Sequence, residues 1–67
     1  MGDLKISLAA ARVNAGMSQE QLCKVLRVSK TTLCNWEKGY KEPTYNAVRR
    51  VSELSGIPME YIFVPEN

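Results

Sequence analysis

The stretch that decides the fold runs from Ser18 to Gly39 and reads SQEQLCKVLRVSKTTLCNWEKG. Its pattern predicts two short helices joined by a tight turn, because Ser18 and Ser29 each precede a helix-forming segment and can act as N-caps. Gln21, three residues after Ser18, completes a capping box. Only two residues separate the end of the first helix from the second cap, so the chain must turn sharply there.

The second of these helices has two chemically different sides. At about 100° per residue, a polar stripe falls within roughly 140° of arc, and its members are Lys30, Thr31, Cys34, Asn35 and Lys38. Leu33 and Trp36 lie on the apolar side, so we expect the indole in the core rather than stacked on a base. On an isolated helix such a stripe would be an ordinary solvated face. Anchored on a helix-turn-helix, its amide, hydroxyl and ammonium groups suit the major groove of DNA.

Positive charge is concentrated around this helix. The whole chain has a net charge of only +2. Between residues 24 and 41, however, a single acid, Glu37, stands among five basic residues, namely Lys24, Arg27, Lys30, Lys38 and Lys41. An ordinary mixture of solvated charges is the competing interpretation, but the location favours an anionic partner.

Length and composition exclude several other classes. We expect residues 1–67 to form a single small domain. No apolar run is long enough to span a bilayer and residues 1–5 do not begin a signal peptide, so we expect a cytoplasmic protein without a membrane partner. The chain has no histidine, no metal-ligand spacing and no phosphate-binding loop. We therefore expect no enzymatic activity, no metal and no cofactor.

The two cysteines, Cys23 and Cys34, could in principle form a disulfide. We expect reduced thiols instead, because Cys23 should lie between helices whereas Cys34 belongs to the exposed stripe.

Three more helices are expected around the central pair. The first covers residues 4–15, with Asp3 as N-cap and Gly16 as a left-handed C-cap. The fourth covers residues 45–55 between Thr44 and Gly56, with three residues directed inward, Val48, Val51 and Leu54. A short fifth helix opens at Pro58 and ends at about Phe63. The predicted fold class is therefore all-α, a compact five-helix bundle whose second and third helices form a helix-turn-helix.

The C-terminal segment is unusually apolar, with Ile57, Met59, Ile62, Phe63 and Val64. Residues 61–64 are apolar enough for a short strand, but no partner strand is evident. Part of the segment must close the core, and one interpretation is that the whole segment serves only the core. Our expectation is that some of it stays exposed and pairs with a second copy to form a homodimer, namely Tyr61, Val64 and Pro65. The neighbouring cations of the fourth helix, Arg49 and Arg50, are interpreted as surface charge, with a phosphate contact as the alternative.

Together these features resemble the lambda-repressor-like, Cro/repressor-type helix-turn-helix family, whose members are often called XRE-type regulators. The matching run starts at Arg12 as R-x-x-x-G-M-S-Q-E-Q-L and continues as L-x-V-S-x-x-T-L-x-x-W-E-K-G. It ends with P-T and L-S-G-I, and the resemblance extends from Leu4 to Phe63.

The resemblance implies a role for individual residues. Gln19 matches a glutamine that contacts a DNA phosphate and braces the recognition helix, although capping alone would also explain a polar residue there. Positions that face base edges correspond to Lys30, Thr31 and Asn35. The loop that grips the DNA backbone corresponds to Lys38, Tyr40 and Lys41. A further match is an internal salt bridge between Arg12 and Glu37, which we expect to be partly buried.

Three positions depart from the family pattern. Arg27 replaces a turn glycine that commonly takes positive φ, which costs some strain. Cys23 stands where a small alanine is usual, and its small side chain can be buried. Cys34 replaces a polar residue on the stripe, so its own contact with DNA stays open.

The resulting prediction is a sequence-specific DNA-binding transcription regulator. Its expected form is a repressor of phage or mobile-element type that binds a palindromic operator in double-stranded DNA as a homodimer. The alternative is a protein-interaction module, or an antitoxin-type helix-turn-helix whose main partner is another protein.

Overall fold

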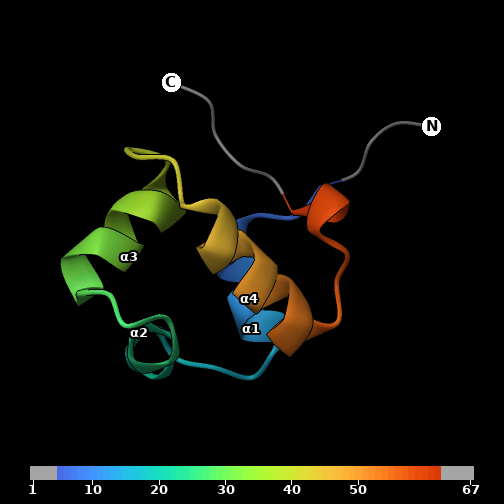
Figure 1. Ribbon diagram of the computed structural model, residues 1–67, viewed down its shortest axis with the longest axis horizontal. Helices are drawn as coiled ribbons and strands as arrows, with labels where there is room; N and C mark the ends of the chain where they lie inside the picture. The colour runs from blue at the N-terminus through green and yellow to red at the C-terminus, as the bar shows by residue number, and fades with distance from the viewer. Residues whose placement is uncertain (1–4, 63–67) are drawn as a thin grey trace.

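The computed structural model describes residues 5–62, which form four α-helices and one 3-10 turn (Figure 1). The elements are α1 (Leu8–Asn14), α2 (Gln19–Leu26), α3 (Lys30–Lys38), α4 (Tyr45–Ser55) and the 3-10 turn η1 (Met59–Tyr61). Within this part of the chain no helix is both long enough and apolar enough to cross a membrane.

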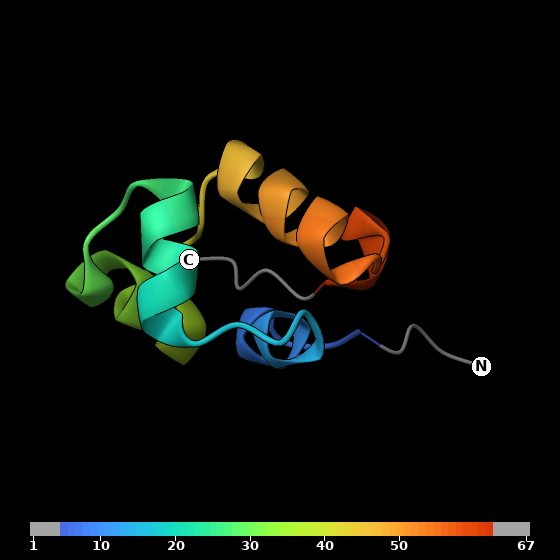
Figure 2. The same ribbon diagram turned by 90° about the horizontal axis from the view of Figure 1, so that it is seen from below.

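The helices pack as two pairs around one core. α4 lies across α1, while α2 and α3 form the helix-turn-helix to one side (Figures 1 and 2). The core receives side chains from all four helices and from the segment after η1: Leu8, Ala11, Leu22, Cys23, Leu33, Trp36, Ala47, Val48, Val51 and Ile62. Because α3 supplies Leu33 and Trp36 to this core, its orientation is set by the whole domain.

The helix caps read from the sequence are confirmed for α2, α3 and α4. Ser18 and Gln21 form the reciprocal capping box, and the hydroxyl groups of Ser29 and Thr44 accept hydrogen bonds from the first turns of α3 and α4. Gly16 takes a left-handed conformation after α1, with φ +74°. Each of these caps satisfies backbone groups that a helix end leaves without partners.

The predicted start of the first helix is wrong. α1 begins at Leu8, and its N-cap is Ser7, whose Oγ accepts a hydrogen bond from the Ala10 N–H at 3.0 Å. The helix cannot start earlier because Ile6 is extended and pairs in parallel with Ile62. The expected cap Asp3 and the expected first residue Leu4 lie outside the described residues.

The predicted fifth helix is also wrong, because η1 is a single 3-10 turn. Its bonds run from Tyr61 N–H to Pro58 O and from Ile62 N–H to Met59 O. At Ile62 the backbone becomes extended, and the Ile6 N–H donates to Tyr61 O at 2.8 Å. As expected from the sequence, no strand forms near residue 61 within the described part of the chain, but Ile62 makes a single isolated bridge with Ile6 that the sequence did not reveal. Burial of Ile62, which is 3% exposed, favours this pairing over another helical turn.

One predicted core residue of the fourth helix lies at the surface. Val48 and Val51 are buried as expected, whereas Leu54 is 36% exposed. The chain turns at this end of α4, and Ile57 packs against the core there instead.

Candidate nucleic-acid interface

α3 presents the predicted polar stripe outward. Lys30, Thr31 and Lys38 are exposed, and Cys34 and Asn35 are partly exposed. On the opposite side of the helix Leu33 is completely buried and Trp36 is 7% exposed. The helix is therefore anchored by two large apolar side chains while its hydrogen-bonding groups remain accessible.

The start of α3 brings the first members of the stripe to the positive end of the helix. The Ser29 hydroxyl accepts from the Thr32 N–H at 3.1 Å and donates to Thr32 Oγ1 at 2.9 Å. This cap fixes the first turn, in which Lys30 and Thr31 lie. Cationic and hydroxyl groups beside a helix N-terminus favour an anionic or acceptor-rich surface.

Arg27 forms the turn between α2 and α3 in a left-handed conformation, with φ 60° and ψ 46°. The position therefore has the geometry that glycine adopts without steric cost. An arginine is tolerated here because its N–H and that of Val28 both donate to Cys23 O, which closes the end of α2.

Glu37 connects three parts of the domain. Its carboxylate accepts from Arg12 Nε at 2.8 Å and from Gln19 Nε2 at 2.9 Å. Arg12 also donates to Met17 O at 2.9 Å. The side chains of Arg12 and Glu37 are only 15% and 7% exposed. We call Arg12, Gln19 and Glu37 the Glu37 cluster. It links α1 and the first turn of α2 to the inner flank of α3.

The Gln19 amide contacts α3, the helix that the resemblance expects it to brace, through a partner that the sequence did not specify. One end donates to Glu37, and the Cys34 thiol faces the other end, with 3.8 Å between Sγ and Oε1. A small hollow next to it is lined by Arg12, Ser18, Gln19, Glu20 and Lys30. No local pattern reveals a contact between positions 19 and 37, because the two residues are 18 positions apart in the sequence.

The end of α3 holds the remaining candidate residues. Gly39 is left-handed, and the N–H groups of Tyr40 and Lys41 both donate to Asn35 O, at 2.9 and 3.3 Å. Lys38 Nζ lies 5.9 Å from the centroid of the Tyr40 ring. Lys38, Tyr40 and Lys41 are all exposed at this end of α3, so the stripe continues from Lys38 into the following loop.

Both cysteines are free thiols with different surroundings. Burial between the helices raises the pKa of Cys23, and the nearby Cys34 and Glu37 act in the same direction. Cys34 belongs to the stripe and is partly exposed. Of the two, Cys34 is the one placed to meet a ligand on α3.

Arg49 and Arg50 lie on α4 and do not belong to the stripe or to the Glu37 cluster. Both are more than half exposed, and they share Glu53 as an ion-pair partner. Their surroundings are those of surface charges, in agreement with the sequence interpretation.

Comparison with known proteins gives a consistent result. A family model described as helix-turn-helix matches residues 8–62. An uncharacterized HTH-type transcriptional regulator of Methanocaldococcus jannaschii is 31% identical over 64 residues, which cover 96% of this chain and 97% of the relative. No solved structure matches the chain.

Proposed function

Because the chain belongs to the helix-turn-helix family, we propose that it is a transcription regulator that binds DNA through α3, with the stripe in the major groove. The observation that carries this proposal is the two-sided helix. Leu33 and Trp36 hold it in the core, while a row of donors and acceptors faces solvent. A major groove admits one α-helix and displays a distinct pattern of donors and acceptors for each base pair.

The stripe contains three candidates for reading bases. Asn35 can present a donor and an acceptor together to an adenine edge. Thr31 offers a hydroxyl to a base or its methyl group to a thymine. Lys30, at the start of the helix, can reach guanine or a phosphate. Cys34 lies between these residues, so its thiol meets the same groove.

The DNA backbone is held at both ends of α3 in this arrangement. At one end, a phosphate accepts the amide hydrogen of Gln19 that Glu37 does not use. The same phosphate lies at the N-terminus of α2, whose first N–H groups have no intrahelical partner. At the other end, Lys38, Tyr40 and Lys41 contact the neighbouring backbone. These contacts position the protein and carry no sequence information by themselves.

A homodimer on a palindromic operator is the functional unit that we propose. One module buries only roughly 600–1,000 Å² on DNA, so two modules on half-sites about 34 Å apart give a more stable complex. Tyr61, 49% exposed, is available to a second copy, whereas Ile62 is used by the core. The other expected dimer residues, Val64 and Pro65, lie outside the described residues, as does Phe63, the predicted end of the fifth helix. Repression would follow from occupation of an operator that polymerase needs, as in phage or mobile-element repressors.

Selection of bound sites from random double-stranded DNA tests this function directly. The expected result is a palindromic consensus whose half-sites are one helical turn apart, with an affinity that falls steeply as salt rises. A consensus without symmetry would contradict the homodimer but not the DNA-binding role. Absence of any binding at low salt would contradict the DNA-binding role and favour a protein partner.

A further inference from the structure

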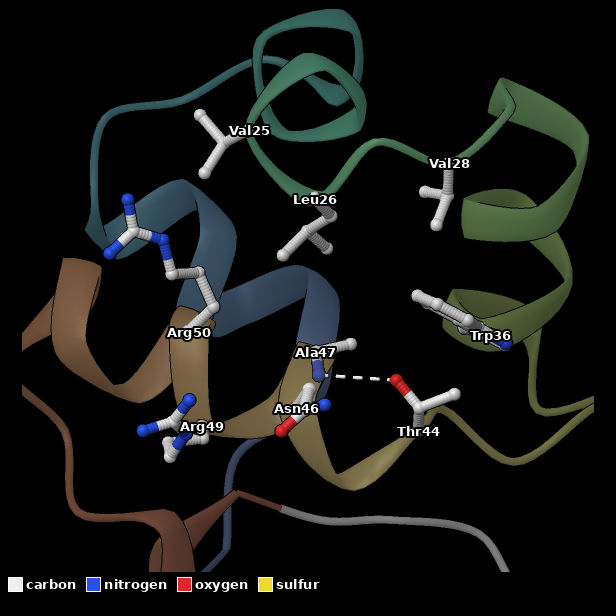
Figure 3. Close-up of a pocket in the computed structure, with 9 residues that line it drawn as sticks. All are labelled: Val25, Leu26, Val28, Trp36, Thr44, Asn46, Ala47, Arg49 and Arg50. Atoms are coloured by element: carbon white, nitrogen blue, oxygen red, sulfur yellow. Dashed lines mark hydrogen bonds between the residues drawn. The ribbon is translucent and has the colours of Figure 1, made fainter.

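A second surface feature lies between the end of α2 and the first half of α4. It is an open hollow of about 330 Å³ (Figure 3). Its apolar lining comes from Leu26, Val28, Trp36 and Ala47, and Val25, which is 37% exposed, stands at its edge. The hollow thus exposes apolar surface at a place where three elements of the domain meet.

The hollow faces away from the stripe of α3. On the helix, Trp36 lies about 170° from the middle of the stripe, and Trp36 lines the hollow. A molecule bound in the hollow would therefore contact the back of the helix-turn-helix. It would leave Lys30, Thr31 and Asn35 accessible.

Two cations stand at one end of the hollow, opposite Trp36 (Figure 3). Arg49 and Arg50 pair with the same carboxylate, Glu53, at 4.0 and 3.3 Å. All three side chains are more than half exposed, and exposed pairs of this kind contribute little to stability. Among residues 5–62, one acid pairs with these two guanidinium groups, which leaves excess positive charge at the rim. An incoming carboxylate can replace Glu53 with little loss of stability.

We propose that this hollow docks an acidic, amphipathic segment of a partner protein while α3 is free to contact DNA. Apolar side chains of the segment would fill the hollow against Trp36 and Ala47, and its carboxylates would pair with Arg49 and Arg50. Guanidinium groups suit this role because they bind carboxylates in a bidentate fashion. A small molecule fits less well. Ligand pockets enclose most of the ligand's surface, whereas this hollow is small and open to solvent.

A peptide-display selection on the full-length protein tests the docking. A library of random peptides about 12 residues long is selected against the wild-type chain. Enriched sequences should combine Asp or Glu with large apolar residues, and their binding should change the emission of Trp36, the single tryptophan of the chain. Failure to enrich any sequence, or enrichment of sequences without acidic residues, would overturn the proposal.

Matched variants then locate the binding. R49Q/R50Q removes the two rim cations, and K5Q/K24Q removes two exposed cations that do not line the hollow. The first variant should weaken the selected acidic peptide by about tenfold or more, as expected for loss of a charge-assisted contact. The second should change it less than about twofold, which is the scale of a general charge effect on a surface. Equal weakening by both variants would show a nonspecific attraction and overturn the proposal.

A substitution at the apolar edge of the hollow tests the other half of the site. Val25→Ser removes a methyl-bearing side chain that is already partly exposed, so the fold should be retained, as a thermal melt can verify. Peptide affinity should fall, because the variant removes apolar contact area at the edge of the hollow. Unchanged affinity in a folded Val25→Ser protein would show that the peptide binds elsewhere.

DNA binding supplies the last arm of the test. The selected DNA site should bind the wild-type protein with or without saturating peptide, and R49Q/R50Q should not weaken DNA binding more than K5Q/K24Q. A larger loss in R49Q/R50Q would assign the rim to DNA phosphates and overturn the docking proposal. The peptide measurements contain no DNA, so failure of the DNA-binding function would be seen separately.

Discussion

The two flanks of α3 use polar residues for opposite purposes. On the outer flank, Lys30, Thr31 and Asn35 face solvent, and α3 is held in place without them. On the inner flank, the Glu37 carboxylate is 7% exposed and is bound by Arg12 and Gln19. Substitutions on the outer flank should therefore change binding at constant stability. Substitutions on the inner flank should change stability first and binding only as a consequence.

The largest expected effect is that of Arg12→Ala, which leaves the Glu37 carboxylate partly buried beside Gln19 alone. Breaking a buried pair in this way costs roughly 3–5 kcal/mol, a large part of what a small domain has. Denaturant unfolding should show the loss, and DNA binding should fall in proportion to the unfolded fraction.

The matched control is Arg50→Ala, which removes an arginine from an exposed pair and should cost about 1 kcal/mol or less. Adding Glu37→Gln to Arg12→Ala should recover part of the stability, because it removes the unpaired charge. An Arg12→Ala protein that melts like the wild type but does not bind DNA would contradict the division between the flanks.

A smaller effect is expected from Asn35→Ala on the outer flank. If Asn35 reads one base pair, the variant should lose about 1–3 kcal/mol on the preferred site and tolerate other bases there. Its melting temperature should stay close to that of the wild type. Site selection with the variant checks the specificity, and a large drop in stability would place Asn35 with the inner flank.

Lys41→Ala should have a more uniform effect, because Lys41 is assigned to the backbone. Every DNA sequence should bind more weakly, and the slope of log affinity against log salt should fall by about one. Parallel gel-shift salt series with Lys41→Ala and Asn35→Ala make this comparison. If the two variants change specificity and salt dependence alike, the assignment of base and backbone roles is wrong.

The smallest effect is predicted for Arg27→Gly in the turn. A left-handed residue with a side chain costs roughly 1–2 kcal/mol, whereas glycine loses about 0.5–1 kcal/mol of additional chain entropy on folding. The variant should therefore be slightly more stable in denaturant unfolding, by about 0.5–1 kcal/mol. Arg27→Ala keeps the left-handed cost and should show no such gain. Destabilisation by Arg27→Gly would mean that the arginine side chain makes a stabilising contact.

Some elements were predictable because their signals are local. Ser18, Ser29 and Thr44 accept hydrogen bonds from N–H groups three residues further on. The stripe of α3 follows from helical geometry once the position of Trp36 is known. Positive φ at Arg27 was expected from the resemblance, and the structure has it.

Other elements depended on contacts between distant parts of the chain. Ile6 pairs with Ile62, and this one pairing explains both the late start of α1 and the replacement of the fifth helix by η1. Neither segment carries a local signal for its partner. The contact of Gln19 with Glu37 and the hollow beside α4 were missed for the same reason.

The sequence by itself determined where α2, α3 and α4 begin and end, and which side of α3 is polar. Caps and helical periodicity involve residues only a few positions apart, so they can be read along the chain. The tertiary structure alone decided which polar groups are held inside around Glu37 and which cations border an apolar hollow. These arrangements result from the packing of helices that are distant in sequence. Burial costs a polar side chain free energy unless it is hydrogen-bonded, and its partners come from the helices packed against it.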